Sequence, residues 1–501
     1  MKIKILGLNE LIKFSLFFNF IFLRLSFCYV IIPLKYLPVY KINDTTPSSI
    51  MRNIIHTKAY ATIELGTPKQ SIQIPLNFDS NDFYISEHGK YEFSKEPSKF
   101  ADLKFYNSSS SNSCEKVEEK IYDGDNFDYS SYYKDTFYFG EKEVELEFYL
   151  PIILKHPESG GIGLQLWPKL EETTSTVDDK RTFLRKLKNN KLIDGYYWSI
   201  FYDSKDYNKK EGFILLGSLP HNLDMDLGYY KKEYFNSTYM KNINAEIWVD
   251  ILKYRFKVDD VYAFEGNNKE KKLNDINFPE NATNLKTIEL DYHFSGIQIS
   301  NRFQSYFEKY FEEFITNKEC YYGNFTLTRK KYFFYCKNDK NLISKIKKNF
   351  PGFNFKSIQL DFNFELVAND LFVEENNFVY CIMFFDSSPG DMWIMGRPFL
   401  QKYQFIFNPD NKYINFYSNL DKINNDNTDF NNLNSNNIYV ILIVVISASL
   451  VIILILGFLA YKFYFQLKIL KKKRANELDD DYDYVQKIDP NHKDALGTIN
   501  E

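Results

Sequence analysis

The sequence predicts an all-β body followed by one transmembrane helix. Between about residues 59 and 418, short alternating or apolar runs are separated by Gly, Pro, Asn and Asp, a spacing typical of strands joined by turns. Within this body the clearest helical periodicity lies in residues 301–315 and 341–350. Residues 438–461 form one uncharged apolar stretch, which has the length of a membrane span.

The first 28 residues predict a signal peptide. Lys2 and Lys4 precede an apolar run over residues 14–27. Residues 26–28 (SFC) form a plausible cleavage triplet, with the small residues Ser26 and Cys28 at its two ends. The run is short and contains Arg24, which favours cleavage over a retained anchor. Cleavage after Cys28 leaves four of the five cysteines, an even number that suits an oxidising lumen.

Strand candidates follow one another along the body. Five of them are AYATIEL (59–65), SIQIPLNF (71–78), DTFYFG (135–140), GFILLGS (212–218) and YQFIFN (403–408). No repeat at the period of a solenoid accompanies them. Residues 419–437 are rich in Asn and Asp and poor in apolar residues, so we expect a flexible stalk there.

Residues 438–461 predict the membrane anchor. A helix of this length rises about 36 Å, enough to cross a bilayer core. A basic cluster follows between residues 462 and 474, which predicts that the tail, residues 462–501, lies in the cytosol. We therefore expect a single-pass type I protein whose ectodomain faces the secretory or endosomal lumen or the cell surface.

The ectodomain also carries sequence signals for glycosylation. N-x-S/T sequons occur at Asn43, Asn107, Asn236, Asn281 and Asn324, and each is a candidate glycan site in a secretory compartment.

Composition excludes several classes of function. The formal net charge of −4 over 501 residues excludes a globally basic nucleic-acid binder. Hydrophobic residues make up 44% of the chain, too many for a mostly disordered protein. No Cys-x-x-Cys occurs and the six His are scattered, so neither a metal site nor a cofactor is expected.

Four motifs give the chain a resemblance to a known family. In order they are LGTPKQ (65–70), GGIGL (160–164), WSIF (198–201) with EGFILLG (211–217), and WIMGRPFL (393–400). Together they resemble the pepsin family of aspartic proteases. The resemblance implies a bilobal β fold with a peptide-binding cleft, an N-terminal lobe over 59–217 and a C-terminal lobe over 218–418. Residues 29–58 would then be either a prosegment or a first strand.

The chemistry of that family needs two carboxylates, one from each lobe. Two carboxylates about 3 Å apart share one proton, because both cannot ionise at that separation. The ionised member takes a proton from the attacking water, and the protonated member donates to the peptide carbonyl. In the family each carboxylate comes from a D-T/S-G loop, whose hydroxyl braces the pair.

The second-lobe loop keeps its carboxylate. Asp291 matches the family aspartate in IELDYHFS (288–295). Tyr292 stands where the family has its bracing Thr, and His293 stands where it has Gly. A histidine cannot easily adopt a backbone conformation reserved for glycine.

The first-lobe loop lacks the matching carboxylate. Counting without gaps from Gly66, and back from the strand at Phe83, puts the catalytic position at Asn77 in both cases. Asn is close to Asp in shape but has no ionisable proton. The alternative alignment places Asp79 at that position, at the cost of a two-residue insertion before it and a two-residue deletion after it.

Two further features are implied by the resemblance. Tyr122, in IYDGD (121–125), matches the tyrosine of the family's flap hairpin. Cys336 and Cys381 lie where the family has its second-lobe disulfide, while Cys114 and Cys320 could pair or stay free.

Three functions are compatible with the sequence. The first is an impaired family member that binds a peptide or protein ligand in its cleft. The second is an active aspartic endopeptidase of an acidic secretory or endosomal compartment. The third is a structural surface glycoprotein. The motifs identify a family and not an activity, because activity belongs to the site; the oligomeric state is left open.

Overall fold

The chain forms two compact units, Met1–Asn424 and Asn425–Glu501. The computed structural model describes residues 28–38, 45–78, 80–87, 104–122, 127–154, 160–166, 182–204, 210–244, 246–248, 253–266, 268–273, 286–326, 330–386, 392–409, 411–420, 462 and 464–469. In the second unit the described residues are helical. No helix of the described ranges is long and apolar enough to cross a bilayer, and the expected span at 438–461 lies outside them.

A thirteen-stranded sheet organises the first unit, with strand order β11-β27-β26-β9-β10-β1-β2-β3-β8-β4-β7-β6-β5. Its strands are β1 (Val30–Pro38), β2 (Thr57–Leu65), β3 (Gln70–Asn77), β4 (Phe83–Ile85), β5 (Glu115–Tyr122), β6 (Phe127–Phe139), β7 (Lys142–Leu154), β8 (Gly160–Gly163), β9 (Trp198–Tyr202), β10 (Glu211–Leu216), β11 (Met240–Asn244), β26 (Ile406–Asn408) and β27 (Tyr413–Tyr417). The sheet therefore joins strands from both sides of the lobe boundary expected at residue 217.

Two smaller sheets follow in the second half of this unit. The ten-stranded sheet contains β12 (Glu246–Trp248), β13 (Lys253–Lys257), β16 (Thr287–Leu290), β17 (Ile297–Ile299), β18 (Cys320–Thr326), β19 (Lys330–Lys337), β22 (Phe372–Glu375), β23 (Phe378–Cys381), β24 (Met383–Asp386) and β25 (Trp393–Met395). The four-stranded sheet contains β14 (Asp260–Glu265), β15 (Asn268–Lys272), β20 (Gly352–Ser357) and β21 (Phe362–Leu366).

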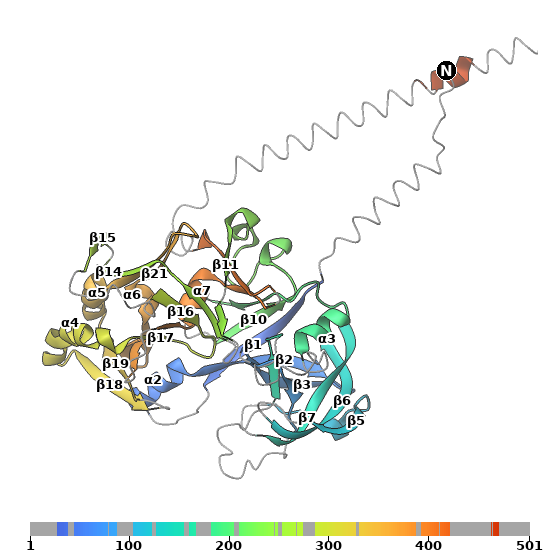
Figure 1. Ribbon diagram of the computed structural model, residues 1–501, viewed down its shortest axis with the longest axis horizontal. Helices are drawn as coiled ribbons and strands as arrows, with labels where there is room; N and C mark the ends of the chain where they lie inside the picture. Colours follow the sequence, from blue (N-terminus) through green and yellow to red (C-terminus); the bar gives the residue numbers. More distant parts are fainter. Residues whose placement is uncertain are drawn as a thin grey trace, which may run out of the picture. The chain divides into compact units, whose positions relative to one another are not determined.

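The described α-helices are short and lie between strands (Figure 1). They are α2 (Pro47–Ile55), α3 (Phe183–Asn189), α4 (Gln304–Thr316), α5 (Lys340–Asn349), α6 (Ala368–Leu371) and α7 (Arg397–Tyr403). Both segments with predicted helical periodicity are confirmed. In α4, Phe307, Phe311 and Phe314 repeat at helical spacing and are buried. In α5, Asp339 caps the first turn by accepting from the Leu342 N–H at 2.9 Å.

The five strand candidates all contain strands, namely β2, β3, β6, β10 and β26. In the last candidate the strand begins only at Ile406, because α7 runs to Tyr403 before it. Gln404 ends that helix with φ 48°, a left-handed conformation common just beyond helix ends. The body is thus mostly β, as the sequence predicts, with helices in addition.

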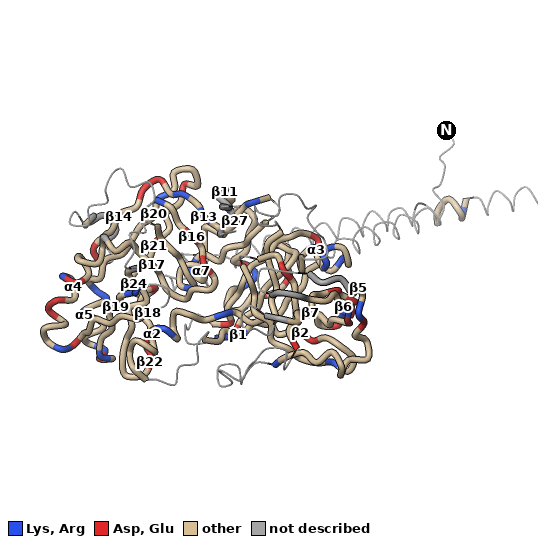
Figure 2. The backbone as a smooth tube through the Cα atoms, turned by 60° about the horizontal axis from the view of Figure 1, so that its bottom comes forward, with Lys and Arg blue, Asp and Glu red and all other residues tan. Residues whose placement is uncertain are grey.

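β1 lies inside the large sheet, between β10 and β2 (Figure 1). Its alternate residues Val30, Ile32, Leu34 and Tyr36 are buried, as expected of a strand with one face on a core. Basic and acidic residues are both dispersed over the backbone (Figure 2), which agrees with a chain whose formal net charge is only −4.

Candidate functional site

The first candidate loop joins β3 to β4 and is closed by β8. β8 runs parallel to β3 and antiparallel to β4, so that Ile162 pairs with Leu76 on one side and with Phe83 on the other. Gly163 is needed at this crossing, because a Cβ there would lie 2.6 Å from the Ser80 carbonyl oxygen. The described part of the loop between the two strands, residue 78 and residues 80–82, is thereby held against β8.

The second candidate loop has the same construction from β16, β25 and β17. Met395 pairs in parallel with Leu290 and antiparallel with Ile297. The Asp291 N–H donates to the Met395 carbonyl at 3.0 Å. Gly396 takes the role of the crossing glycine, because a Cβ there would collide with the Phe294 carbonyl.

The two loops correspond residue for residue. In each loop, one residue of the crossing strand pairs with two residues that lie seven positions apart in the chain. These two residues are Leu76 and Phe83 in the first loop, and Leu290 and Ile297 in the second. The N–H of each crossing glycine also donates to the backbone carbonyl of the residue just before the strand that follows the loop. These bonds are 2.8 Å to Asp82 and 3.0 Å to Gly296.

Asn77 and Asp291 each follow directly on the first-strand partner of their loop. Asp291 is half-buried, and its Oδ1 accepts a hydrogen bond of 2.8 Å from the His293 N–H. Asn77 is 5% exposed, and its amide lies against Gly161, where a Cβ would come within 2.6 Å of Nδ2. The first loop thus presents a carboxamide at the position where the second presents a carboxylate.

Aromatic rings join the two loops. The Phe78 ring centroid lies 4.9 Å from that of Tyr292 and 5.0 Å from that of His293. Phe78 and Tyr292 are both 7% exposed. These are the residues that follow Asn77 and Asp291, so apolar ring packing occupies the positions at which the family places its hydroxyl brace.

A larger aromatic cluster supports this contact. Trp198 packs against Phe78 at 5.5 Å and stacks on Phe407 at 4.2 Å between ring centroids. Tyr254 meets Trp198 edge-on, and burial raises the pKa of its hydroxyl well above the usual range. Gln165 donates from Nε2 to the Phe78 carbonyl at 2.6 Å, so the backbone of the first loop is also tied to its own lobe.

The junction between α2 and β2 holds the second loop. The Ser295 N–H donates to the Ile55 carbonyl at 2.8 Å, and the hydroxyls of Ser295 and Thr57 lie 2.5 Å apart. His56, which lies between Ile55 and Thr57 in the sequence, packs its ring on Phe294 with a centroid distance of 6.1 Å. Sequence reasoning missed this contact, because nothing in residues 55–57 signals a partner in the second lobe.

Burial lowers the pKa of His56 to about 4, with smaller contributions from the positive charges of Lys331 and Arg52. His56 is therefore held neutral in the folded protein over the neutral and mildly acidic pH range.

The remaining expected residues are placed as follows. Tyr122 is the last residue of β5 and pairs with Ser130 of β6 in a hairpin; its side chain is outside the described part of the chain. Asn107, Asn236 and Asn324 are exposed. Asp79, Asn43 and Asn281 lie outside the described residues.

The expected disulfide between Cys336 and Cys381 is wrong. Cys336 is bonded to Cys320, which lies directly opposite it in the β18–β19 hairpin. On its other side Cys336 faces Val379, so Cys381 lies two residues farther along β23. That diagonal separation is about 7 Å between Cα atoms, beyond what a disulfide spans without backbone movement. Cys381 is a free, buried thiol.

Within the described residues there is no cluster of His, Cys, Asp and Glu that could hold a metal ion. Comparison with family models matches residues 58–418 to the eukaryotic aspartyl protease family. No curated protein matches the chain significantly.

Proposed function

The chain belongs to the eukaryotic aspartyl protease family, and we propose that it is a membrane-anchored member with an impaired catalytic site. It acts by binding a peptide or protein ligand in the cleft that the family relationship implies. The anchor is the apolar segment 438–461 with the basic cluster that follows it.

The single observation that carries the impairment is the correspondence between Asn77 and Asp291. Both residues follow the strand position that pairs with the crossing strand. A carboxamide at one of these positions can hydrogen-bond a water but cannot exchange a proton with it. Asp291 alone cannot act both as the base for that water and as the acid for the peptide carbonyl.

Two neighbouring substitutions support the same proposal. Neither Phe78 nor Tyr292 has the small Thr or Ser side chain whose hydroxyl braces the carboxylates in the family. Their aromatic rings pack on each other instead. His293 adds an imidazole beside Asp291, where the family has no side chain. Loss of one member of a catalytic unit already costs orders of magnitude in rate.

The proposal is tested with the full-length protein in detergent. Hydrolysis of a denatured protein substrate is measured from about pH 3 to about pH 7. We expect no hydrolysis by the wild type. We expect activity to appear in the variant Asn77→Asp with Asp79→Gly and His293→Gly, which restores the carboxylate and both loop glycines.

The control set separates the other two functions. Wild-type hydrolysis that is abolished by Asp79→Ala and by Asp291→Ala, but survives Asn77→Ala, would show an active endopeptidase and overturn the proposal. A screen of the folded wild type against a peptide library tests the binding role. Failure of every peptide to bind would instead favour a structural glycoprotein.

A further inference from the structure

A second candidate binding site lies in the C-terminal half of the body, between α5 and β22. It is a pocket of about 470 Å³, which is within the range of pockets that hold small ligands or parts of peptides. Ile343, Val367 and Ala368 give it an apolar floor. None of its lining residues belongs to the two candidate loops or to the aromatic cluster between them.

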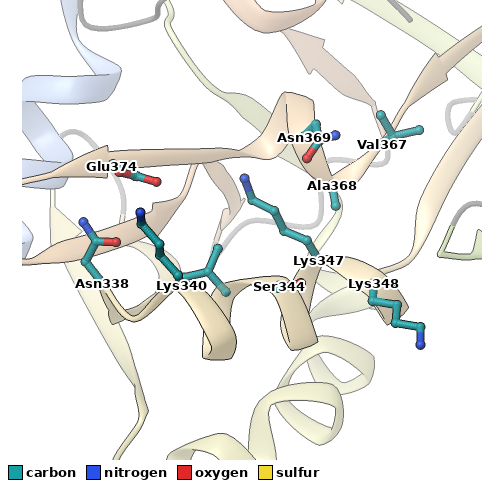
Figure 3. Close-up of a pocket in the computed structure, with 10 residues that line it drawn as sticks. Asn338, Lys340, Ser344, Lys347, Lys348, Val367, Ala368, Asn369 and Glu374 are labelled. Carbon is teal, nitrogen blue, oxygen red and sulfur yellow. The ribbon is translucent and has the colours of Figure 1, made fainter.

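The polar rim of this pocket is predominantly basic. Lys340, Lys347 and Lys348 line it, against one acidic residue, Glu374. Figure 3 shows the ammonium groups of Lys340 and Lys347 directed toward the strand that carries Glu374, while Lys348 turns away. Among the described residues, no salt bridge is recorded for these three lysines. The Lys347 ammonium lies over the Phe372 ring, 6.0 Å from its centroid, a contact that leaves its charge unneutralised.

The opposite wall carries Glu374 of β22, a strand at the end of the ten-stranded sheet. β22 ends the strand order of the ten-stranded sheet and, among the described strands, pairs with β23 alone. A strand at a sheet edge leaves alternate N–H and C=O groups available to an added strand. Burial of Phe372 and Val373 holds this edge in place against the core.

We propose that this pocket binds an acidic peptide segment in extended conformation, added as a strand to the edge of β22. The backbone of the segment pairs with β22, its apolar side chains face the floor formed around Ile343, and its carboxylates face Lys340 and Lys347. Addition of a strand to a sheet edge is a general mode of peptide recognition, and the lysines select for negative charge. The site is separate from the cleft implied by the family, so it stands whether or not the cleft binds peptides.

The test measures fluorescence anisotropy of a short labelled peptide that alternates valine and glutamate, with the full-length protein in detergent. Replacing Lys340 and Lys347 by Gln together should weaken binding about tenfold, and raising the salt concentration should weaken it further. Lys345→Gln is the matched control. Lys345 lies on the same helix but pairs with Glu313 at 3.2 Å, so its replacement should leave affinity unchanged.

Two further probes separate strand addition from other forms of anion binding. The same peptide with alternate backbone nitrogens methylated keeps its charge but cannot pair with an edge, and it should bind at least about tenfold more weakly. Equal binding of the methylated peptide, equal binding of a valine–lysine peptide, or unchanged binding in the double variant would overturn the proposal. Inorganic phosphate or anionic vesicles are added as competitors. If either fully displaces the peptide, and if its own binding is weakened by the double lysine replacement as much as that of the peptide, the site is a simple anion or membrane-surface site. That result would also overturn the proposal.

Discussion

The rings of Phe78 and Tyr292 pack with their centroids 4.9 Å apart, joining two loops whose residues lie far apart in the chain. Each ring is buried and follows directly on the residue that stands at the candidate catalytic position of its loop. The contact therefore couples the geometry of Asn77 and Asp291 to the packing of two buried aromatic rings.

Truncation of this contact should destabilise the protein strongly. We expect Phe78→Ala to lower the free energy of unfolding by about 3–4 kcal/mol, since it removes a buried aromatic side chain and leaves a cavity. Urea denaturation of the full-length protein measures the change. Tyr239→Ala is the control, because Tyr239 is 48% exposed, and its effect should stay within about 0.5 kcal/mol. Equal effects of the two changes would show that the ring contact is not part of the core.

A buried ion pair lies two residues before Asp291. Arg255 binds Glu289 through Nε at 2.8 Å and through Nη2 at 2.6 Å, and the Glu289 side chain is fully buried. Glu289→Gln should therefore cost about 3 kcal/mol, because it leaves a guanidinium without its counter-charge. The exposed pair of Lys345 and Glu313 provides the control, and Glu313→Gln should cost less than about 1 kcal/mol. A cost for Glu289→Gln as small as for the control would contradict the expected role of burial.

The buried His56 should make stability depend on pH. Its pKa is lowered to about 4 in the folded protein, against about 6.5 in an unfolded chain. The unfolded state therefore binds a proton first as the pH falls. The stabilisation is fully present above about pH 6.5, declines as the pH falls from there to about 4, and does not decline further below that value.

The measurement for His56 is the thermal midpoint of wild type and His56→Gln between about pH 7 and about pH 4. The wild type should lose more stability than the variant over this range, by up to about 3 kcal/mol. Parallel curves for the two proteins would argue against the proton linkage. His221→Gln serves as a comparison, since His221 lies outside the contact with the second loop and its pKa is lowered less by burial.

The cysteines should differ in reactivity. Burial raises the pKa of the Cys381 thiol to about 12, so little thiolate is present at neutral pH. Iodoacetamide should leave Cys381 unmodified in the folded protein and modify it after denaturation, as followed by mass spectrometry of peptides. Cys114 is half-buried and should react faster. Recovery of a linked Cys336–Cys381 peptide, in place of Cys320–Cys336, would overturn the observed pairing.

The exposed sequons should carry glycans if the ectodomain enters the secretory pathway. Asn107, Asn236 and Asn324 all lie on the surface, where the glycosylation machinery can reach them. Replacing each of these residues by Gln should lower the mass of the protein expressed in secretory cells by one glycan. Enzymatic deglycosylation should remove the mass differences between the wild type and the variants. An unchanged mass for all three variants would contradict glycosylation at these three sites.

Local patterns predicted much of this fold. The alternation in residues 59–65 and 71–78 and the helical spacing of Phe307, Phe311 and Phe314 all correspond to observed elements. Such patterns succeed because burial of one face sets the period of the chain. The disulfide was mispredicted because spacing along the chain does not reveal that Cys320 stands opposite Cys336 in a hairpin.

The sequence by itself determined the family of this protein, through motifs at both ends of the body, and the residue types at its candidate site. The sequence also specified that Asn77 and Asp291 stand at the two catalytic positions of the family. Counting residues from a motif to such a position succeeds where the strands between them are continuous. The tertiary structure alone decided that Phe78 meets Tyr292, that Thr57 meets Ser295 and that Cys320 binds Cys336. These contacts depend on which strands cross and in what register, and that follows from the packing of the whole core and not from any local run of residues.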